Sequence, residues 1–350
     1  MTVIPAFTAK RLILARHRRR MTLAALARAA KLTTHSITHF ENRLKYPSPQ
    51  SLDRLAGALD VTPEFLLAPP PRQILSETMS LRSPTRLTAR KRYSAVAVAE
   101  LTAALVSWIE THLWLPCPNL PSWPQLDPEH AAESLRAHWQ MGDAPSGPLT
   151  PLLESHGIRI FALPPDCGDV GAFSTRQTGT PFAFLPPHLD GEQARQHLAY
   201  ELGQLVLGHN RPGHRDSRPA AIQFASAFLM PRTAVVASML RTATPERLAA
   251  AASAWGVPTS AVLHRLHDLE LLPEWAHRTT MQGLGHETTP SNQPRPAHVE
   301  RSHLLPKAVA HLRARRLPID SVAELTALHT DDPPRWPTTT SPAAPASADK

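Results

Sequence analysis

The chain has 350 residues, 42% of them hydrophobic, which is enough for two or three domains with buried cores. Its two cysteines, Cys117 and Cys167, exclude a disulfide scaffold and a CxxC metal site and suit a reducing cytoplasm. No apolar run approaches the ~18 residues of a membrane span, and the first residues lack the apolar core of a signal peptide. We therefore expect neither membrane insertion nor secretion.

The positive charge is concentrated at one end of the chain. The formal net charge is +8, and residues 1–72 alone hold 12 Lys and Arg against 4 Asp and Glu. The remaining residues hold 25 of each kind, so their charges cancel. A small basic module on a neutral body is typical of a polyanion-binding domain, because phosphate contacts supply most non-specific affinity for nucleic acids. A solvated basic surface is the alternative.

Five short helices are predicted in this basic module. The first spans residues 8–20 and ends in the basic run 16–20. Thr22 and Thr33 are good N-caps for the next two helices, and residues 51–59 and 63–67 supply two more. In the third helix only Ile37 and Phe40 are strongly apolar, so one narrow edge packs and the rest faces outward. This succession resembles the Cro/phage-repressor (XRE) type of helix-turn-helix.

That resemblance implies that the third helix enters the major groove of double-stranded DNA. The base-reading candidates are Thr34, His35, Thr38 and His39. The phosphate-contacting candidates are Thr33, Ser36, Asn42, Arg43 and Lys45. For the histidines, a solvated helix surface is the alternative. Two glycines usual in the family are replaced by Lys31 and Arg43 at positions that often need φ > 0, so we expect some strain or a small shift at both.

A connector and an α+β domain follow. The prolines at 69–71 form a stiff spacer, residues 90–113 predict one long apolar helix, and residues 116–124 form a proline-rich loop. Helices are then expected at 128–141 and 149–156, and short strands at 158–162, 172–175 and 181–185. A hairpin turn at residues 177–179 joins the last two strands.

Residues 195–208, RQHLAYELGQLVLG, predict a buried helix with a modified metal-site motif. Tyr200, Glu201 and Gln204 share one face and match the skeleton of H-E-x-x-H, in which two histidines hold zinc and the glutamate activates water. The glutamate is retained, whereas both histidine positions are replaced.

Residues 223–232, QFASAFLMPR, supply a second motif. Together, E-L-G-x-L-V-L and F-A-x-x-F-L-M-P resemble the ImmA/IrrE-type metallopeptidase family, whose fold is thermolysin-like and often follows a helix-turn-helix domain. In that family the third zinc ligand is a glutamate about six residues before the F-A pair, where this chain has Arg218. An arginine cannot coordinate zinc. The resemblance therefore implies no metal, no cofactor and no catalytic residue, with a vestigial site of Tyr200, Glu201, Gln204 and Arg218.

Two alternatives concern this site. A shifted metal site could use His197 and Glu201 with one of His209, His214 or Asp216. Separately, the guanidinium of Arg218 could fill the vacated metal position and pair with Glu201. The competing arrangement has an exposed Arg218 and a Glu201 that is hydrogen-bonded elsewhere.

The expected fold is multidomain: an all-α helix-turn-helix domain, then an α+β thermolysin-like (zincin-derived) domain and a helical C-terminal region. Two helices within residues 245–269 look like a helix-turn-helix but lack a basic excess, so we expect a packing hairpin. The predicted boundaries are 1–72 for the DNA-binding domain, 73–126 for the connector, 127–275 for the peptidase-like domain, 276–330 for the helical region and 331–350 for a disordered tail.

The favoured function is a cytoplasmic, nucleoid-associated transcriptional regulator that binds double-stranded DNA as a homodimer, with an inactive peptidase-like domain for sensing or dimerisation. A small molecule or a protein is a possible effector at the altered cleft. One alternative is an active ImmA/IrrE-type metallopeptidase that cleaves a repressor. Another is an antitoxin-like protein-interaction module.

Overall fold

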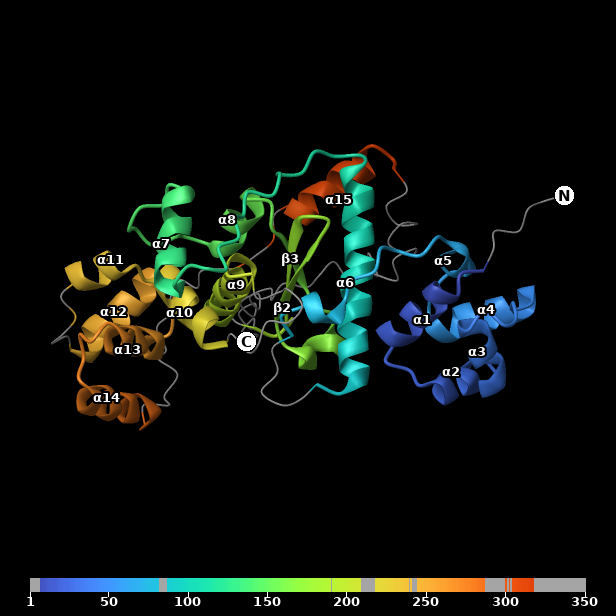
Figure 1. The fold of residues 1–350 in the computed structure, drawn as a ribbon, viewed down its shortest axis with the longest axis horizontal. Coiled ribbons are helices and arrows are strands. Elements are labelled where there is room, and N and C mark those ends of the chain that lie inside the picture. The colour runs from blue at the N-terminus through green and yellow to red at the C-terminus, as the bar shows by residue number, and fades with distance from the viewer. Residues whose placement is uncertain are drawn as a thin grey trace, which may run out of the picture.

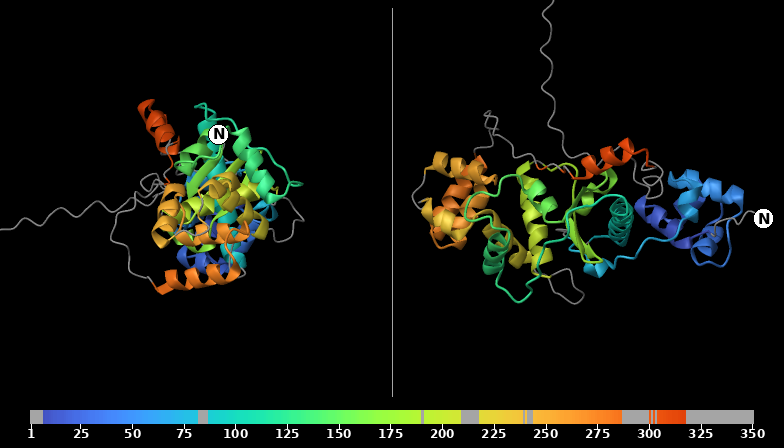
Figure 2. Two further views of the ribbon diagram at one scale, coloured as in Figure 1. Left: turned by 90° about the vertical axis from the view of Figure 1, so that its left-hand side faces the viewer. Right: turned by 90° about the horizontal axis from the view of Figure 1, so that it is seen from above.

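The structure is a computed structural model that describes residues 7–81, 87–189, 191–208, 218–238, 240, 244–286, 300, 302 and 304–317. The described elements are spread along the long axis of the molecule, and the last helix, α15 (Leu304–Ala314), returns to the middle beside α6 (Ala89–Glu110) (Figure 1). Five short helices lie at one end, a long helix and a small sheet lie in the middle, and a group of helices lies at the other end (Figures 1 and 2). The expected multidomain arrangement, helical at first and then α+β, is confirmed.

The N-terminal bundle consists of five helices: α1 (Ala9–Arg18), α2 (Leu23–Ala29), α3 (Thr34–Glu41), α4 (Pro49–Leu59) and α5 (Pro63–Leu67). Hydroxyl side chains begin four of them, because Thr22, Thr33, Ser48 and Thr62 each accept a hydrogen bond from the backbone N–H three residues later. The apolar residues of all five helices form one core, which includes Leu12, Leu26, Ile37, Leu55 and Phe65.

Of the strain and the small shift expected at Lys31 and Arg43, the structure has the strain, since both residues adopt left-handed backbone. Lys31 has φ 53° and Arg43 has φ 59°, directly after α2 and α3 respectively. A side chain in this conformation costs roughly 1–2 kcal/mol, which glycine would avoid. The turns of the bundle are therefore retained despite the missing glycines.

Helix α6 (Ala89–Glu110) connects the bundle to the rest of the molecule. It contributes Leu101 to the core of the bundle, and Val98 and Val106 to the core against the sheet. The expectation that no apolar run reaches the length of a membrane span is wrong for this helix, since its alanines, valines and leucines make it long and apolar enough to cross a membrane. However, 67% of that apolar window is buried inside the protein, so these side chains are used in packing.

The sheet has three strands, β1 (Arg159–Ala162), β2 (Phe173–Gln177) and β3 (Thr180–Leu185), in the order β1-β3-β2. Strand β3 is parallel to β1 and antiparallel to β2. The β2–β3 hairpin turns at Thr178 (φ 50°) and Gly179 (φ 88°), as expected for a tight two-residue turn with positive φ at both positions.

Alternating side chains of the sheet face two different cores. Phe182 and Phe184 of β3 pack with α6, whereas Ala183 and Leu185 join the core that contains α9 (Gly191–Val206). This alternation follows from the two-residue period of a β-strand. The sheet is therefore covered by α6 on one face and by α9 on the other.

Of the remaining helices, α15 packs on α6, whereas the others surround α9 or extend beyond it. They are α7 (Pro128–His138), α8 (Leu149–Ser155), α10 (Arg218–Leu229), α11 (Arg232–Ala237), α12 (Pro245–Trp255), α13 (Thr259–Asp268), α14 (Glu274–His286) and α15 (Leu304–Ala314). Helices α12 and α13 bury Leu248, Val262 and Leu266 in the main core, which confirms the packing hairpin. Helices α14 and α15 fall in or overlap the helical region expected at 276–330, whereas residues 318–350, with the predicted tail at 331–350, lie outside the described residues.

Candidate functional site

The outer face of α3 is the first candidate site. The helix packs on α1 and α2 and lies on the side of the bundle away from the sheet (Figure 1). Ile37 and Phe40 are buried, as the sequence predicted, whereas Thr34 and His35 are exposed and Thr38 and His39 are half-buried. The helix therefore presents a polar surface at the end of the molecule.

Local hydrogen bonds fix several side chains of this surface. The Thr33 and Ser36 hydroxyls lie 2.9 Å apart at the beginning of α3, and the Thr38 hydroxyl donates to the carbonyl of Thr34 at 3.0 Å. The rings of His35 and His39 lie one turn apart, with centroids 3.9 Å from each other. The four base-reading candidates thus form one continuous patch of hydroxyl and imidazole groups.

The four arginines of the basic run at residues 16–20 are all engaged in ion pairs within the protein. Arg16 forms a two-pronged ion pair with Glu41, at 2.7 and 2.8 Å. Further ion pairs join Arg18 to Asp166, Arg19 to Asp60, and Arg20 to Asp169. Two of these partners, Asp166 and Asp169, lie outside the basic module, so they offset two of its eight excess positive charges.

The cations near α3 are different. Lys31, Arg43 and Lys45 are exposed and make no ion pair with any residue that the structure describes. Asn42, also exposed, is the C-cap of α3 beside them. These side chains border the polar patch and are available to an external anion.

The altered peptidase motif lies on α9, and its two parts are packing neighbours. A Cβ atom added at Gly203 would lie 2.9 Å from Cδ1 of Phe224 on α10, so the glycine of E-L-G allows the phenylalanine of F-A-x-x-F to approach. The rings of Phe224 and Phe228 are stacked, with centroids 5.9 Å apart. The two motifs therefore meet where α9 and α10 pack against each other.

Glu201 is fully buried at the centre of the altered site. Its carboxylate accepts a hydrogen bond from the Ser174 hydroxyl at 2.8 Å and another from the Ser80 hydroxyl. At the two former histidine positions, the amide of Gln204 donates to the phenol oxygen of Tyr200 at 2.9 Å. The sequence did not point to Ser80 or Ser174, because neither serine belongs to a motif.

The side chains at the two former histidine positions do not suit zinc. A phenol and an amide that bond to each other replace two imidazoles, and zinc in proteins prefers imidazole, thiolate and carboxylate ligands. Among the described residues, no group of three His, Cys, Asp or Glu side chains is arranged to hold a metal ion. His197 lies half-buried on α9, but His209, His214 and Asp216 lie outside the described residues, so the shifted site stays a hypothesis.

Arg218 is half-buried at the first residue of α10. The hydrogen bonds described above for Glu201 come from serine hydroxyls. The pairing of Arg218 with Glu201 therefore stays a prediction.

Residues 72–81, which we call the connector segment, run along the free edge of β2. The side chain of Gln177 donates to the carbonyl of Arg72 at 2.9 Å, and the hydroxyl of Thr175 donates to the carbonyl of Thr78 at 3.2 Å. The backbone N–H of Ser80 then donates to the carbonyl of Ser174 at 3.0 Å. The numbering decreases along β2 as it increases along the connector, so the two segments are antiparallel.

The connector segment thereby occupies the place of an added strand. An exposed sheet edge is the usual docking position for an extended peptide. Here Ile74 and Met79 anchor the segment in the core between the sheet and α6, and a one-turn 3-10 helix, η1 (Ser76–Thr78), lies between them. The edge of the sheet and the carboxylate beneath it are therefore covered by the protein's own chain.

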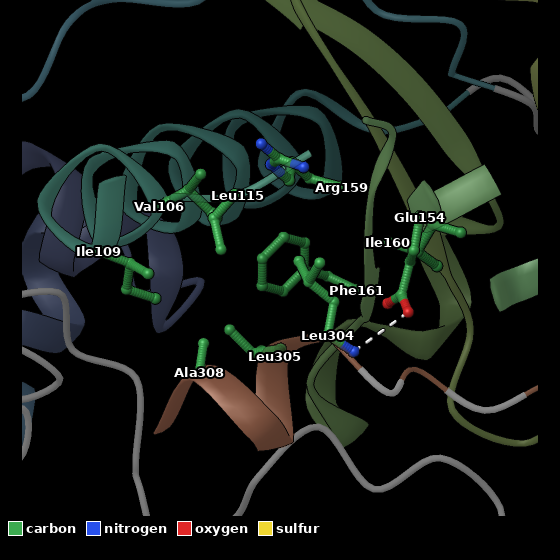
Figure 3. Close-up of a pocket in the computed structure, with 10 residues that line it drawn as sticks. All are labelled: Val106, Ile109, Leu115, Glu154, Arg159, Ile160, Phe161, Leu304, Leu305 and Ala308. Atoms are coloured by element: carbon green, nitrogen blue, oxygen red, sulfur yellow. Dashed lines mark hydrogen bonds between the residues drawn. The ribbon is translucent and has the colours of Figure 1, made fainter. Parts of the chain in front are cut away.

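A cavity elsewhere in the domain is too small for a substrate. It measures about 10 Å³ and lies between α6, β1 and α15, where Val106, Phe161 and Leu305 are among its lining residues (Figure 3). At its margin Glu154 accepts a hydrogen bond from the backbone of Leu304 at 3.1 Å. This volume is at or below that needed for a single water molecule, so the cavity is a gap in the packing.

The fold and the two sites define a helix-turn-helix DNA-binding domain joined to a peptidase-type α+β domain. Comparison with protein families gives the same result. Residues 11–71 match the model of the Cro/C1-type HTH DNA-binding domain, and residues 153–267 match a peptidase family model described as the IrrE N-terminal-like domain. The chain therefore joins a region similar to the Cro/C1-type HTH domain to a region similar to the IrrE N-terminal-like domain. No curated protein and no solved structure matches the chain.

Proposed function

We propose that the protein is a sequence-specific DNA-binding transcriptional regulator that is cytoplasmic and associated with the nucleoid. One observation carries the proposal: α3 buries Ile37 and Phe40 and presents an exposed or half-buried polar face of hydroxyl and imidazole groups, beside cations that are not engaged within the described protein. That is the arrangement in which the second helix of a helix-turn-helix enters the major groove.

The chemistry of the exposed patch suits base reading. Threonine hydroxyls can donate to or accept from base edges, and the threonine methyl group can contact the methyl group of thymine. Thr34 and Thr38 would supply these contacts, and the His35–His39 pair would add ring nitrogens beside them. Arg43 and Lys45 would hold the phosphate backbone and fix the register of the helix.

A second copy of the chain is part of the proposal. One short recognition helix with four base-reading side chains supplies limited specificity. Dimeric helix-turn-helix proteins solve this by binding two half-sites about 34 Å apart. We therefore propose a homodimer and a nearly palindromic operator.

We propose that the peptidase-type domain is catalytically inactive. A zinc peptidase needs its metal to lower the pKa of bound water from about 15.7 to near 7. Here the residues at the ligand positions do not suit zinc, and Glu201 is hydrogen-bonded to Ser80 and Ser174 beneath the connector segment. The domain would then serve dimerisation or the sensing of an effector.

An active metallopeptidase is the second candidate, because residues 153–267 match a peptidase family model. It would require metal ligands other than Tyr200 and Gln204. Zinc analysis separates the two candidates, since an enzyme of this type would contain stoichiometric metal.

Selection of DNA sequences from a random pool by the full-length protein tests the proposed function. We expect enrichment of one motif with two half-sites about one helical turn apart. Replacing Thr38 or His39 by alanine should relax the preference at one position of each half-site, with a loss of about 1–3 kcal/mol in discrimination. Arg247→Ala, an exposed change on α12, is the control. A pool that remains random after selection would contradict the proposal.

A further inference from the structure

A hollow of about 300 Å³ lies between the end of α1 and the beginning of α6. We call it the α1–α6 groove. Three arginines (Arg16, Arg20 and Arg90), Thr22 and the rings of His17 and Tyr93 line it. Its volume is at the lower end of that of ligand pockets, and it is open to solvent.

The groove and its rim carry a net positive charge. Glu41 and Asp169 neutralise Arg16 and Arg20, and Lys91 of α6 shares Asp169 at 3.0 Å. Arg90 and the nearby Arg92 are exposed and form no ion pair within the described part of the chain. The groove and its rim therefore carry a cationic excess that an external anion could neutralise.

The two rings form a neutral wall of the groove. His17 and Tyr93 are stacked, with centroids 4.7 Å apart and planes 10° apart. Burial, followed by the charge of Arg16, lowers the pKa of His17 to about 4, so the imidazole is uncharged at pH 7. The attraction for an anion thus comes chiefly from Arg90 and Arg92, with the Tyr93 hydroxyl as an additional donor.

The position of the groove indicates which anion it meets. Thr22 lines the groove and is also the N-cap of α2, the first helix of the helix-turn-helix. In this motif the first helix crosses the DNA backbone while the second lies in the major groove. The first turns of α6 lie on the same side of the molecule as α2 and α3 (Figure 1). The groove therefore continues the DNA-facing side of the bundle toward the body of the protein.

The bundle holds α6 in a fixed position. Helix α1 packs along α6, and Arg18 and Arg20 of α1 form ion pairs with Asp166 and Asp169 of the short helix η2 (Pro165–Val170). The carboxylate of Asp169 also binds Lys91 of α6. A phosphate held by Arg90 would consequently lie in a constant register with the bases beneath α3.

We propose that the α1–α6 groove binds a backbone phosphate of DNA that flanks the sequence read by α3, with Arg90 as the principal direct contact. The proposal rests on the proposed DNA-binding function and extends it. It gives the body of the protein a direct part in DNA binding, beyond that of the helix-turn-helix itself.

The test compares full-length protein and its Arg90→Ala variant on two duplexes that carry the selected motif, one with long flanks and one trimmed to the motif. On the long duplex, losing one phosphate contact should reduce the slope of log K against log salt by about 0.9. Affinity should fall equally for selected and scrambled long DNA, because a phosphate contact carries no sequence information. On the trimmed duplex the variant and the unaltered protein should be alike.

Two further variants sharpen the comparison. Arg90→Lys should retain the salt slope, because the charge remains, and Arg247→Ala on α12 should change nothing. Equal slopes for Arg90→Ala and unaltered protein on both duplexes would overturn the groove proposal. So would stoichiometric binding of inorganic phosphate that Arg90→Ala abolishes without changing DNA affinity. Failure of the unaltered protein to prefer any sequence would instead overturn the proposed function.

Discussion

The hydroxyl of Ser80 donates a hydrogen bond to the carboxylate of Glu201, although 121 residues separate them in the sequence. Glu201 is the one residue of the H-E-x-x-H skeleton that this chain retains, and it is fully buried. Ser80 belongs to the connector segment, which leads directly from the DNA-binding bundle. The altered cleft and the bundle are therefore linked through the segment that covers the cleft.

Replacing Ser80 by alanine should destabilise the protein. The variant loses the bonds of this hydroxyl to Glu201 and to the backbone N–H of Ser174. Buried polar groups that lose a partner cost about 1–3 kcal/mol. Urea unfolding measures this difference. Ser76→Ala is the matched control, because the Ser76 hydroxyl makes no hydrogen bond with any described residue. Equal stability of the two variants would show that the Ser80 bonds are unimportant.

Metal content should depend on three positions. We expect no stoichiometric zinc in the unaltered protein, and about one zinc per chain after the combined changes Tyr200→His, Gln204→His and Arg218→Glu, which restore the ligand types of the family motif. Elemental analysis of protein purified without chelators measures both. The double variant that keeps Arg218 should bind zinc more weakly. Stoichiometric zinc in the unaltered protein would instead favour a shifted site and the peptidase function.

The ion pair between Arg20 and Asp169 should make domain docking depend on pH. The hydrogen bond from Arg20 is the main reason that the pKa of Asp169 is lowered to about 2. The unfolded value is about 3.9, so the stabilisation is complete above that pH and is lost as the pH falls toward 2. Because Asp169 is half exposed, we expect only about 0.5–1 kcal/mol from this pair.

Comparison with Asp169→Asn tests this pH dependence. The difference in unfolding free energy between the variant and the unaltered protein should be constant above about pH 5 and should shrink as the pH falls below about 4. Glu133→Gln, on the exposed face of α7, serves as the control. A difference that grows at low pH would contradict the ion-pair interpretation.

Glycine at Lys31 should stabilise the bundle. Lys31 has φ 53°, a conformation in which an ordinary side chain costs roughly 1–2 kcal/mol. After the entropy that glycine gains in the unfolded chain, a net increase of up to about 1 kcal/mol remains. Arg54→Gly is the control with the same loss of charge, and it should destabilise by about 1 kcal/mol because Arg54 lies inside α4. Thermal unfolding of both variants measures the contrast.

Local sequence patterns predicted most of the helices and strands. The features that they did not predict depend on contacts between residues far apart in the sequence. Thr22 and Thr33 marked helix starts because a cap is a local hydrogen bond. The β2–β3 hairpin followed from its turn residues, for the same reason. In contrast, Arg18 and Asp166 form an ion pair across 148 positions of the sequence, and no local sequence pattern predicts such a pair.

The same limit applies to the altered site. The missing zinc ligands could be read from the motif itself, since each family position is a single residue. The contact between Ser80 and Glu201 could not be predicted from the sequence, because the connector segment has no motif and its position depends on the free edge of β2. Nor could the sequence indicate that α6 supplies Leu101 to the first core, because an apolar stripe does not identify its partner.

The sharing of α6 between two cores has a practical consequence for anyone who dissects this protein. Leu101 is fully buried in the core of the bundle, while Val98 and Val106 of the same helix belong to the core of the sheet. A DNA-binding fragment that ends at the proline spacer would expose the apolar surface that Leu101 covers, and we expect it to aggregate. Chimaeras that join this helix-turn-helix domain to another protein should therefore include α6.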